Sequence, residues 1–176
     1  SSQIYRMRWG GGDLRRLTYS GGSKWDVQCV GDRIYFVSDA DGADRIYSIH
    51  VNGSTPRRVT QRVIDPQVIE DAPAVSPDGR QIAFVVRGRA VGAAIHIVDT
   101  TTGQERTLVT QAGHASEPTW SNAMAGRPSR LAFTLRPPDG AQPPGQAQIY
   151  VTDAAAERAT QVTRARGPNW HPLWVR

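Results

Sequence analysis

The residues of this sequence that could perform chemistry are few, and they do not form a catalytic pattern. Cys29 is the only cysteine, so a disulfide framework or a thiolate metal site within one chain is excluded. The sequence has no Gly-x-Ser-x-Gly hydrolase motif, no His-Glu-x-x-His zinc motif and no phosphate-binding P-loop. The four histidines are not at metal-ligand spacing. We therefore expect no catalytic residue, no metal site and no cofactor, and we expect that the chain is not an enzyme.

Two remaining candidates are better explained by structure than by chemistry. Asp39-Ala40-Asp41-Gly42 has the acidic start of a calcium-binding loop but lacks its other ligands, so it predicts a turn between two strands. His96 occupies the position that Tyr47 and Tyr150 occupy in the repeated segments described below. We expect this histidine to serve packing.

The composition is typical of a globular domain with many turns. Hydrophobic residues make up 39% of the 176 residues, and the chain has 17 glycines and 12 prolines. The net charge is +5, but the arginines are scattered and form no basic, aromatic stripe, so we expect no nucleic-acid partner. No stretch approaches the roughly 20 apolar residues of a membrane helix, and we expect no membrane span.

Internal repeats are the strongest signal in the sequence. Short runs of β-branched and aromatic residues alternate with Gly, Pro, Asn and Asp turn residues, which predicts short strands. Four segments end in threonine, about 42 to 53 residues apart, which is the period of a four-stranded propeller blade. These segments are residues 15–18, 57–60, 107–110 and 160–163.

The repeat predicts an all-β fold. We expect a β-propeller of four-stranded antiparallel blades, with about four blades, which is either incomplete or a fragment of a larger ring. The expected boundaries are a half blade at 1–18, full blades at 19–60, 61–110 and 111–163, and the first strand of a further blade at 164–176.

Three arrangements fit this blade count. The chain is an incomplete ring or a fragment of a larger one, or its two ends build a shared blade in a small ring. Alternatively, two copies associate through their open blade edges into a bigger ring. Sharing a blade would remove an exposed sheet edge, but that blade would lack one strand because the sequence stops at Arg176.

Two segments resemble a known family. Residues 71–84, with the turn Ser76-Pro77-Asp78-Gly79, and residues 37–47 resemble the TolB-like (WD40-like) β-propeller repeat. Residues 31–60 also resemble blades in the N-terminal propeller of tricorn-type proteases. The resemblance implies a propeller over nearly the whole chain. It also favours a periplasmic or cell-envelope location over a cytoplasmic one.

The candidate binding residues lie before the expected first strand of each blade. In propellers the loops that enter these strands gather around one mouth of the channel, and binding residues concentrate on loops held by a rigid scaffold. Carboxylates, imidazoles and indoles meeting there would suit a peptide or a basic protein. The alternative is that the carboxylates cap turns and the indoles pack between blades. The candidates are Trp25, Asp26, Asp65, Glu70, Asp71, His114, Glu117, Trp170 and His171.

These features predict a non-catalytic scaffold that binds a protein or a peptide. Two alternatives stay open. The resemblance to peptidase propellers implies a domain that gates substrate entry into a tricorn-like or prolyl-oligopeptidase-like enzyme. A propeller that binds a sugar or another small ligand is the other alternative. Fold alone does not decide among these functions.

Overall fold

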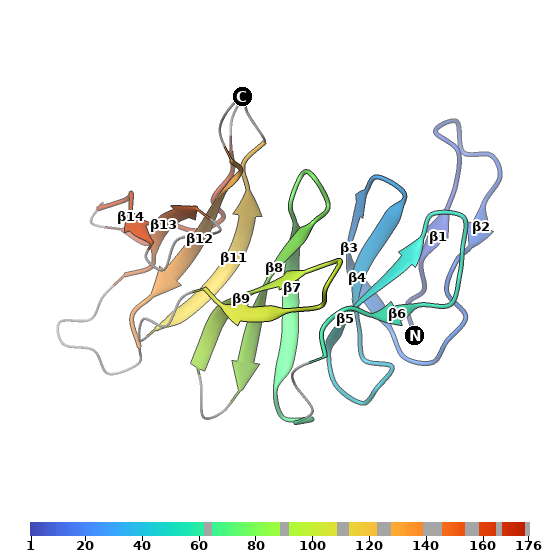
Figure 1. Ribbon diagram of the computed structural model, residues 1–176, viewed down its shortest axis with the longest axis horizontal. Coiled ribbons are helices and arrows are strands. Elements are labelled where there is room, and N and C mark those ends of the chain that lie inside the picture. The colour runs from blue at the N-terminus through green and yellow to red at the C-terminus, as the bar shows by residue number, and fades with distance from the viewer. Residues whose placement is uncertain are drawn as a thin grey trace.

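The computed structural model describes residues 1–61, 65–88, 92–108, 113–122, 128–138, 146–153, 159–164 and 167–174. The regular secondary structure of these residues consists of fourteen β-strands, which confirms the all-β propeller class that the repeat predicts (Figure 1). Within these ranges, no helix has the length and apolar character that a membrane span requires.

The N-terminal part of the chain forms two antiparallel units. A short hairpin pairs β1 with β2, and a four-stranded sheet follows in the order β3-β4-β5-β6. These strands are β1 (Tyr5–Arg6), β2 (Arg15–Arg16), β3 (Lys24–Val30), β4 (Arg33–Ser38), β5 (Arg45–His50) and β6 (Arg57–Arg58).

The remaining strands repeat this pattern twice. Antiparallel pairing connects β7 through β10 and then β11 through β14, and one parallel pair, His114 with Ala93, joins the two sets. The strands are β7 (Ile69–Val75), β8 (Gln81–Gly88), β9 (Gly92–Asp99), β10 (Glu105–Thr107), β11 (His114–Trp120), β12 (Arg130–Arg136), β13 (Gln148–Asp153) and β14 (Thr160–Gln161). The expected blade boundaries at 18, 60, 110 and 163 stay a prediction.

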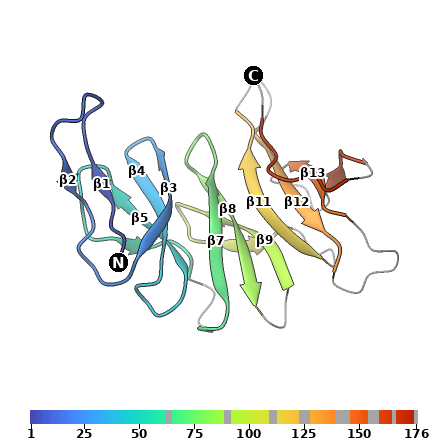
Figure 2. The same cartoon turned by 180° about the vertical axis from the view of Figure 1, so that it is seen from behind.

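The sheets stand side by side in an open arc. Figures 1 and 2 show the β1–β2 hairpin at one end of the arc and β14 at the other. The C-terminal segment lies against β11, where Trp174 Nε1 donates to the carbonyl of Thr119 at 3.1 Å. The two chain ends therefore do not build a shared blade in this structure.

One ring pair marks the same position in each set of four strands. The phenylalanine of the second strand lies directly opposite a tyrosine or histidine of the third. Ring centroids are 5.7 to 6.0 Å apart, close enough for aromatic attraction in addition to burial. The pairs are Phe36–Tyr47, Phe84–His96 and Phe133–Tyr150.

The hydrophobic core lies between neighbouring sheets. Successive residues of a strand point to opposite faces, so each central strand serves two interfaces. Phe36 packs with Ile4 and Leu17 of the N-terminal hairpin, whereas Tyr35 packs with Ile82 of the following sheet. Each sheet therefore packs one or both of its faces on neighbouring sheets, as expected of propeller blades.

The last strand of the second full blade is shifted by one residue from the sequence alignment. The Leu108 N–H donates to the Ile95 carbonyl, as the Val59 N–H donates to Ile46, both at 2.8 Å. Leu108 is therefore the structural counterpart of Val59. Residues 106–108 therefore correspond to 57–59, one position earlier than the repeat in the sequence placed them. Alignment on the closing threonines produced the shift, and Thr110 lies outside the described residues.

Truncation of Phe84 tests the interblade core. This ring is fully buried, so Phe84→Ala should lower the free energy of unfolding by about 3–5 kcal/mol through lost burial and cavity formation. Phe84→Leu should cost less, and Val27→Ala, at a half-exposed position, should change stability by less than about 0.5 kcal/mol. Urea unfolding of the three variants measures this, and equal losses for Phe84→Ala and Val27→Ala would contradict the packing described.

Candidate binding site at the first strands

A kink recurs in the first strand of each blade. Asp26, Ala72, Glu117 and His171 all have positive φ angles, between 48° and 56°, although none is glycine. Such values are uncommon for residues with a side chain. In β3, β7 and β11 the strand register shifts at this point, as in a β-bulge. Three of the nine candidate residues thus occupy one repeated backbone position.

Most candidates lie within strands and not in the linking loops that the sequence predicted. The first strands begin before the kink, but a left-handed residue, followed by a proline in β7 and β11, interrupts the alternation there and hides the strand start. Asp65, Trp170 and His171 lie outside the strands. The candidates within β3, β7 and β11 are Trp25, Asp26, Glu70, Asp71, His114 and Glu117.

The structure brings Glu117 and His171 together. Glu117 Oε1 lies 2.9 Å from His171 Nε2, and its Oε2 accepts the His171 N–H at 2.8 Å. The Thr134 hydroxyl also donates to Oε2, at 3.0 Å. The Glu117 side chain is 28% exposed and that of His171 is 84% exposed. An anchored carboxylate therefore holds an imidazole that is open to solvent.

Trp170 stands next to this pair and is exposed. The preceding residue fixes the segment, because the Asn169 N–H donates to the carbonyl of Ala147 at 2.9 Å and its amide nitrogen donates to the carbonyl of Gly167 at 2.9 Å. The indole is 46% exposed, as a contact residue must be. Neighbouring Trp170 and His171 therefore offer an aromatic surface on a restrained backbone.

Asp26 and Asp71 form an acidic group on neighbouring first strands. Asp71 is mostly buried and pairs with Arg87 Nη2 at 3.2 Å. Burial raises the pKa of Asp71, and Arg87 lowers it, while the charges of Asp26 and Asp44 raise it further. Asp71 is therefore close enough to both carboxylates to be repelled by their charges. A cation placed there would relieve this repulsion.

Glu70 lies in the interior, so it is not an accessible rim residue. Its Oε2 accepts hydrogen bonds from the Thr60 hydroxyl and, at 3.4 Å, from the Ile46 N–H. Burial raises the pKa of Glu70 above its ordinary value, although the Thr60 bond and the nearby Arg45 charge act in the opposite direction. The carboxylate thus belongs to the scaffold between the first two full blades.

A substitution within the repeat explains this buried acid. The Thr18 hydroxyl donates to the side-chain oxygen of Gln3 at 2.8 Å, and the Thr163 hydroxyl donates to that of Gln148 at 2.7 Å. Each threonine hydroxyl also accepts the backbone N–H of the isoleucine that follows the glutamine. In the first full blade, Arg45 stands at the position of this glutamine, and its guanidinium donates to backbone carbonyls. The Glu70 carboxylate, which belongs to the next blade, takes the place of the glutamine oxygen and accepts the hydrogen bond of the Thr60 hydroxyl.

Three other candidates also serve the scaffold. Asp65 Oδ1 accepts the Gln67 N–H at 2.8 Å and so caps a turn. His114 begins β11 and pairs with β9. Trp25 is half-buried on β3. Among the described residues, no group of three or more His, Cys, Asp or Glu could hold a metal ion.

The residues that join the first strands of neighbouring blades are not among the nine candidates predicted from the sequence. Trp120 Nε1 donates to the Ala74 carbonyl at 2.9 Å, and Trp174 makes the equivalent bond to Thr119. Gln28 takes this role one blade earlier by bonding the backbone of β7 at 2.7 and 3.0 Å. The repeated Pro-x-Trp spacing was a usable signal for the two tryptophans.

Comparisons with known proteins agree with this architecture. A family model for the TolB beta propeller domain matches residues 1–121. The chain is 27% identical over 146 residues to a protein described as a TolB homologue from Chlorobium chlorochromatii (strain CaD3). This match covers 82% of the chain and only 29% of the relative, so the chain spans less than a third of that protein.

Solved structures show the same fold. A putative TolB from Agrobacterium tumefaciens matches with a TM-score of 0.72 and 20% identity, over 97% of this chain and 58% of that one. A prolyl endopeptidase matches with a TM-score of 0.60 and 19% identity, over 80% of this chain and 22% of that one. The TolB-like resemblance expected from the sequence is confirmed.

The buried Glu70 predicts a pH-dependent stability. Because its pKa is raised on folding, the folded state binds the proton more tightly than the unfolded state does. This contribution to stability is fully present below pH 4.5, the ordinary value, and is lost as the pH rises through the folded-state pKa. Glu70→Gln keeps an acceptor oxygen but does not titrate, so its stability relative to the parent should increase with pH.

Urea unfolding across a pH series measures this difference. Asp153→Asn, at an exposed carboxylate, controls for the loss of one negative charge. A stability difference between Glu70→Gln and the parent chain that stays constant with pH would contradict the buried-carboxylate interpretation.

Proposed function

The chain belongs to the family of the TolB beta propeller domain, and from this premise we propose that it is a non-catalytic scaffold that binds a protein or a peptide. The proposed site is the mouth formed by the kinked first strands and the segment that follows them. The contact between Glu117 and His171, beside the exposed Trp170, is the observation that carries the proposal.

The chemistry of this mouth suits a basic, partly apolar ligand. Asp26 and Asp71 supply negative charge on neighbouring strands, and Trp170 supplies an exposed indole. Aromatic anchors surrounded by polar groups are typical of protein-binding sites. A lysine or arginine side chain could meet the carboxylates while apolar atoms next to it cover the indole.

The same geometry favours binding over catalysis. A general base must reach a substrate proton, but Glu117 already accepts from Thr134 and from the His171 backbone. Asp71 is similarly held by Arg87. These groups are therefore suited to hold a partner in place. We further propose a location in the bacterial cell envelope, as the resemblance to periplasmic TolB-like proteins implies.

A second candidate function is a propeller that gates substrate entry into a peptidase. It is favoured by the structural match to a prolyl endopeptidase, which at 19% identity concerns the fold alone. The complete reading frame distinguishes the two. A peptidase domain encoded with this chain would support gating, and its absence from the frame would exclude it.

Substitutions at the mouth test the proposed scaffold. We expect the chain to retain a specific protein from envelope extracts, and the double variant Asp26→Asn/Trp170→Ala to weaken binding by about 100-fold. This is the loss expected when about 1 to 2 kcal/mol is removed at each of two contact residues. Quantitative mass spectrometry identifies the partner, and titration with the purified partner measures the dissociation constant.

Trp9→Ala provides a matched control, because Trp9 is fully exposed on the β1–β2 hairpin and lies outside the proposed site. It should leave the dissociation constant unchanged. If the purified partner binds the double variant as tightly as the parent chain, the mouth is not the binding site and the proposal fails.

A further inference from the structure

A polar groove separates the outer strands of the first two full blades. Residues of β4, β5 and β6 form one wall, and the β9–β10 turn at residues 99–103 forms the other. Its volume is about 420 Å³. The β9–β10 turn lies at the far end of β9 from Ala93, which pairs with His114 at the start of β11. The groove is therefore remote from the channel mouth.

Two exposed arginines line this groove. Arg33 begins β4 and Arg57 begins β6, and neither forms an ion pair with any described residue. Arg58 is half-buried, and its charge acts on the interior Glu70. The groove therefore presents two positively charged side chains to solvent.

Two carboxylates lie near the groove, Asp99 in its lining and Asp32 beside Arg33, and neither forms a described ion pair with Arg33 or Arg57. Asp99 accepts the N–H groups of Thr101 and Thr102 at 2.9 and 2.8 Å, and these bonds lower its pKa. Asp32 lies 3.2 Å from His50 Nε2. An anionic ligand could therefore approach the two arginines without displacing an established ion pair.

Hydroxyl groups lie among these cations. Ser48 stands directly opposite Arg57 and also opposite Tyr35, so the three residues form one row across the sheet. Burial is the main cause that raises the pKa of Tyr35, which keeps its phenol protonated and able to donate. With the threonines of the 99–103 turn, the groove offers hydrogen-bond partners for a peptide backbone.

The fold does not require this pair of exposed cations. In the next blade Gln81 occupies the position of Arg33, and in the third Arg130 is bound to Asp153 at 3.1 Å. Since those blades fold without two exposed arginines that lack a described ion pair at these positions, the stability of the fold alone does not explain why Arg33 and Arg57 are present.

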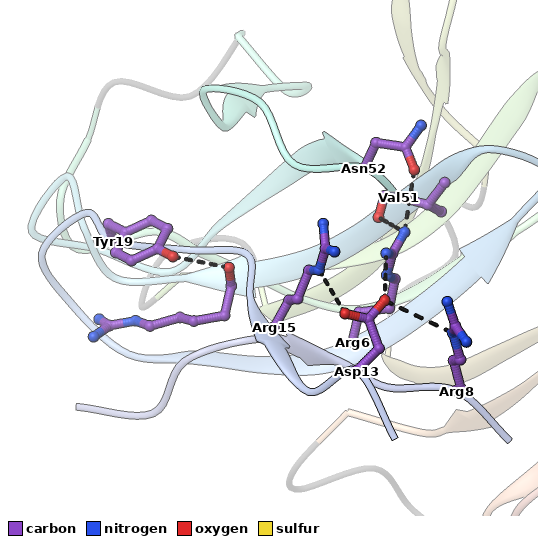
Figure 3. Close-up of polar contacts among 8 residues, drawn as sticks. Arg6, Arg8, Asp13, Arg15, Tyr19, Val51 and Asn52 are labelled. Carbon is purple, nitrogen blue, oxygen red and sulfur yellow. Dashed lines mark hydrogen bonds and ion pairs between the residues drawn. The ribbon is translucent and has the colours of Figure 1, made fainter. Parts of the chain in front are cut away.

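A related groove lies one blade earlier, but its two lining arginines already have partners. Arg15 pairs with Asp13, and Arg16 donates to the Thr18 carbonyl at 2.6 Å and lies over the Tyr19 ring. It is lined by β2 and the turn at residues 52–56. Figure 3 shows the carboxylate of Asp13 between Arg6, Arg8 and Arg15, the last with its Nε 2.8 Å from Oδ1. Arg6 also donates to Asn52 at 3.1 Å. The groove between the two full blades is therefore the stronger anion site.

We propose that this groove binds an extended acidic peptide with carboxylates on alternate residues. Because β5 separates β4 from β6, and Arg33 lies two residues along the strand from the row of Arg57, the backbones of Arg33 and Arg57 are about 12 Å apart. A single small anion would engage one of them closely, whereas carboxylates about 7 Å apart along an extended chain reach both. Guanidinium groups bind carboxylates through paired hydrogen bonds.

Fluorescence anisotropy with a labelled peptide of alternating glutamate and glycine tests the site. The full chain should bind this peptide, and the same peptide with glutamine in place of glutamate should not bind. Arg33→Gln and Arg57→Gln should each weaken binding about tenfold, the loss of one charge-assisted contact. Arg106→Gln is the matched control, because Arg106 is exposed at the position of β10 that corresponds to Arg57.

Several results would overturn the proposal. These are no binding by the parent chain, equal weakening by Arg106→Gln, or full displacement of the peptide by millimolar inorganic phosphate at constant ionic strength, which would indicate a single-oxyanion site. Should Arg57→Gln fail to fold, Arg33→Gln decides alone. Trp170→Ala should leave peptide binding intact, so failure of this site and failure of the channel-mouth site are separately visible.

Discussion

Contact between neighbouring sheets is the interaction on which this structure depends. A four-stranded sheet alone buries neither face, and here each sheet places a fully buried phenylalanine, Phe36, Phe84 or Phe133, against its neighbours. The ring of the opposite tyrosine or histidine extends the same apolar layer. The blades are consequently stable as a series, and every surface feature is positioned through these interfaces.

Hydrogen bonds between first strands fix the positions of the residues of the proposed site. Trp120, Trp174 and Gln28 each bond the backbone of a neighbouring first strand, and the left-handed residue of each strand lies two or three positions away. These bonds fix the positions of the strands, and the kinks set the backbone conformation of Asp26, Glu117 and His171. The polar groups of the proposed site are thus placed by a repeated kink in the backbone, while the residue types at the kink differ from blade to blade.

The sequence predicted the fold well because strand and turn chemistry is local. Alternating β-branched residues and the Ser76-Pro77-Asp78-Gly79 turn were sufficient for the strands and the repeat. Burial of Glu70 could not be predicted, because it follows from Arg45 replacing a glutamine that only the folded blade places beside threonine. The strand positions of Asp26 and Glu117 were hidden by the kink, which breaks the alternation on which strand assignment relies. The binding role of the mouth stays a prediction.

The serial contacts between sheets also determine how the molecule would respond to mechanical load. Neighbouring units are linked mainly by side-chain packing and by isolated bonds such as Trp120 to Ala74, whereas each unit is internally tied by ladders of backbone bonds. Tension applied at the two chain ends would separate one unit from the next before it sheared a sheet. The extension trace would show a stepwise sequence of ruptures, one per interface, and not a single event.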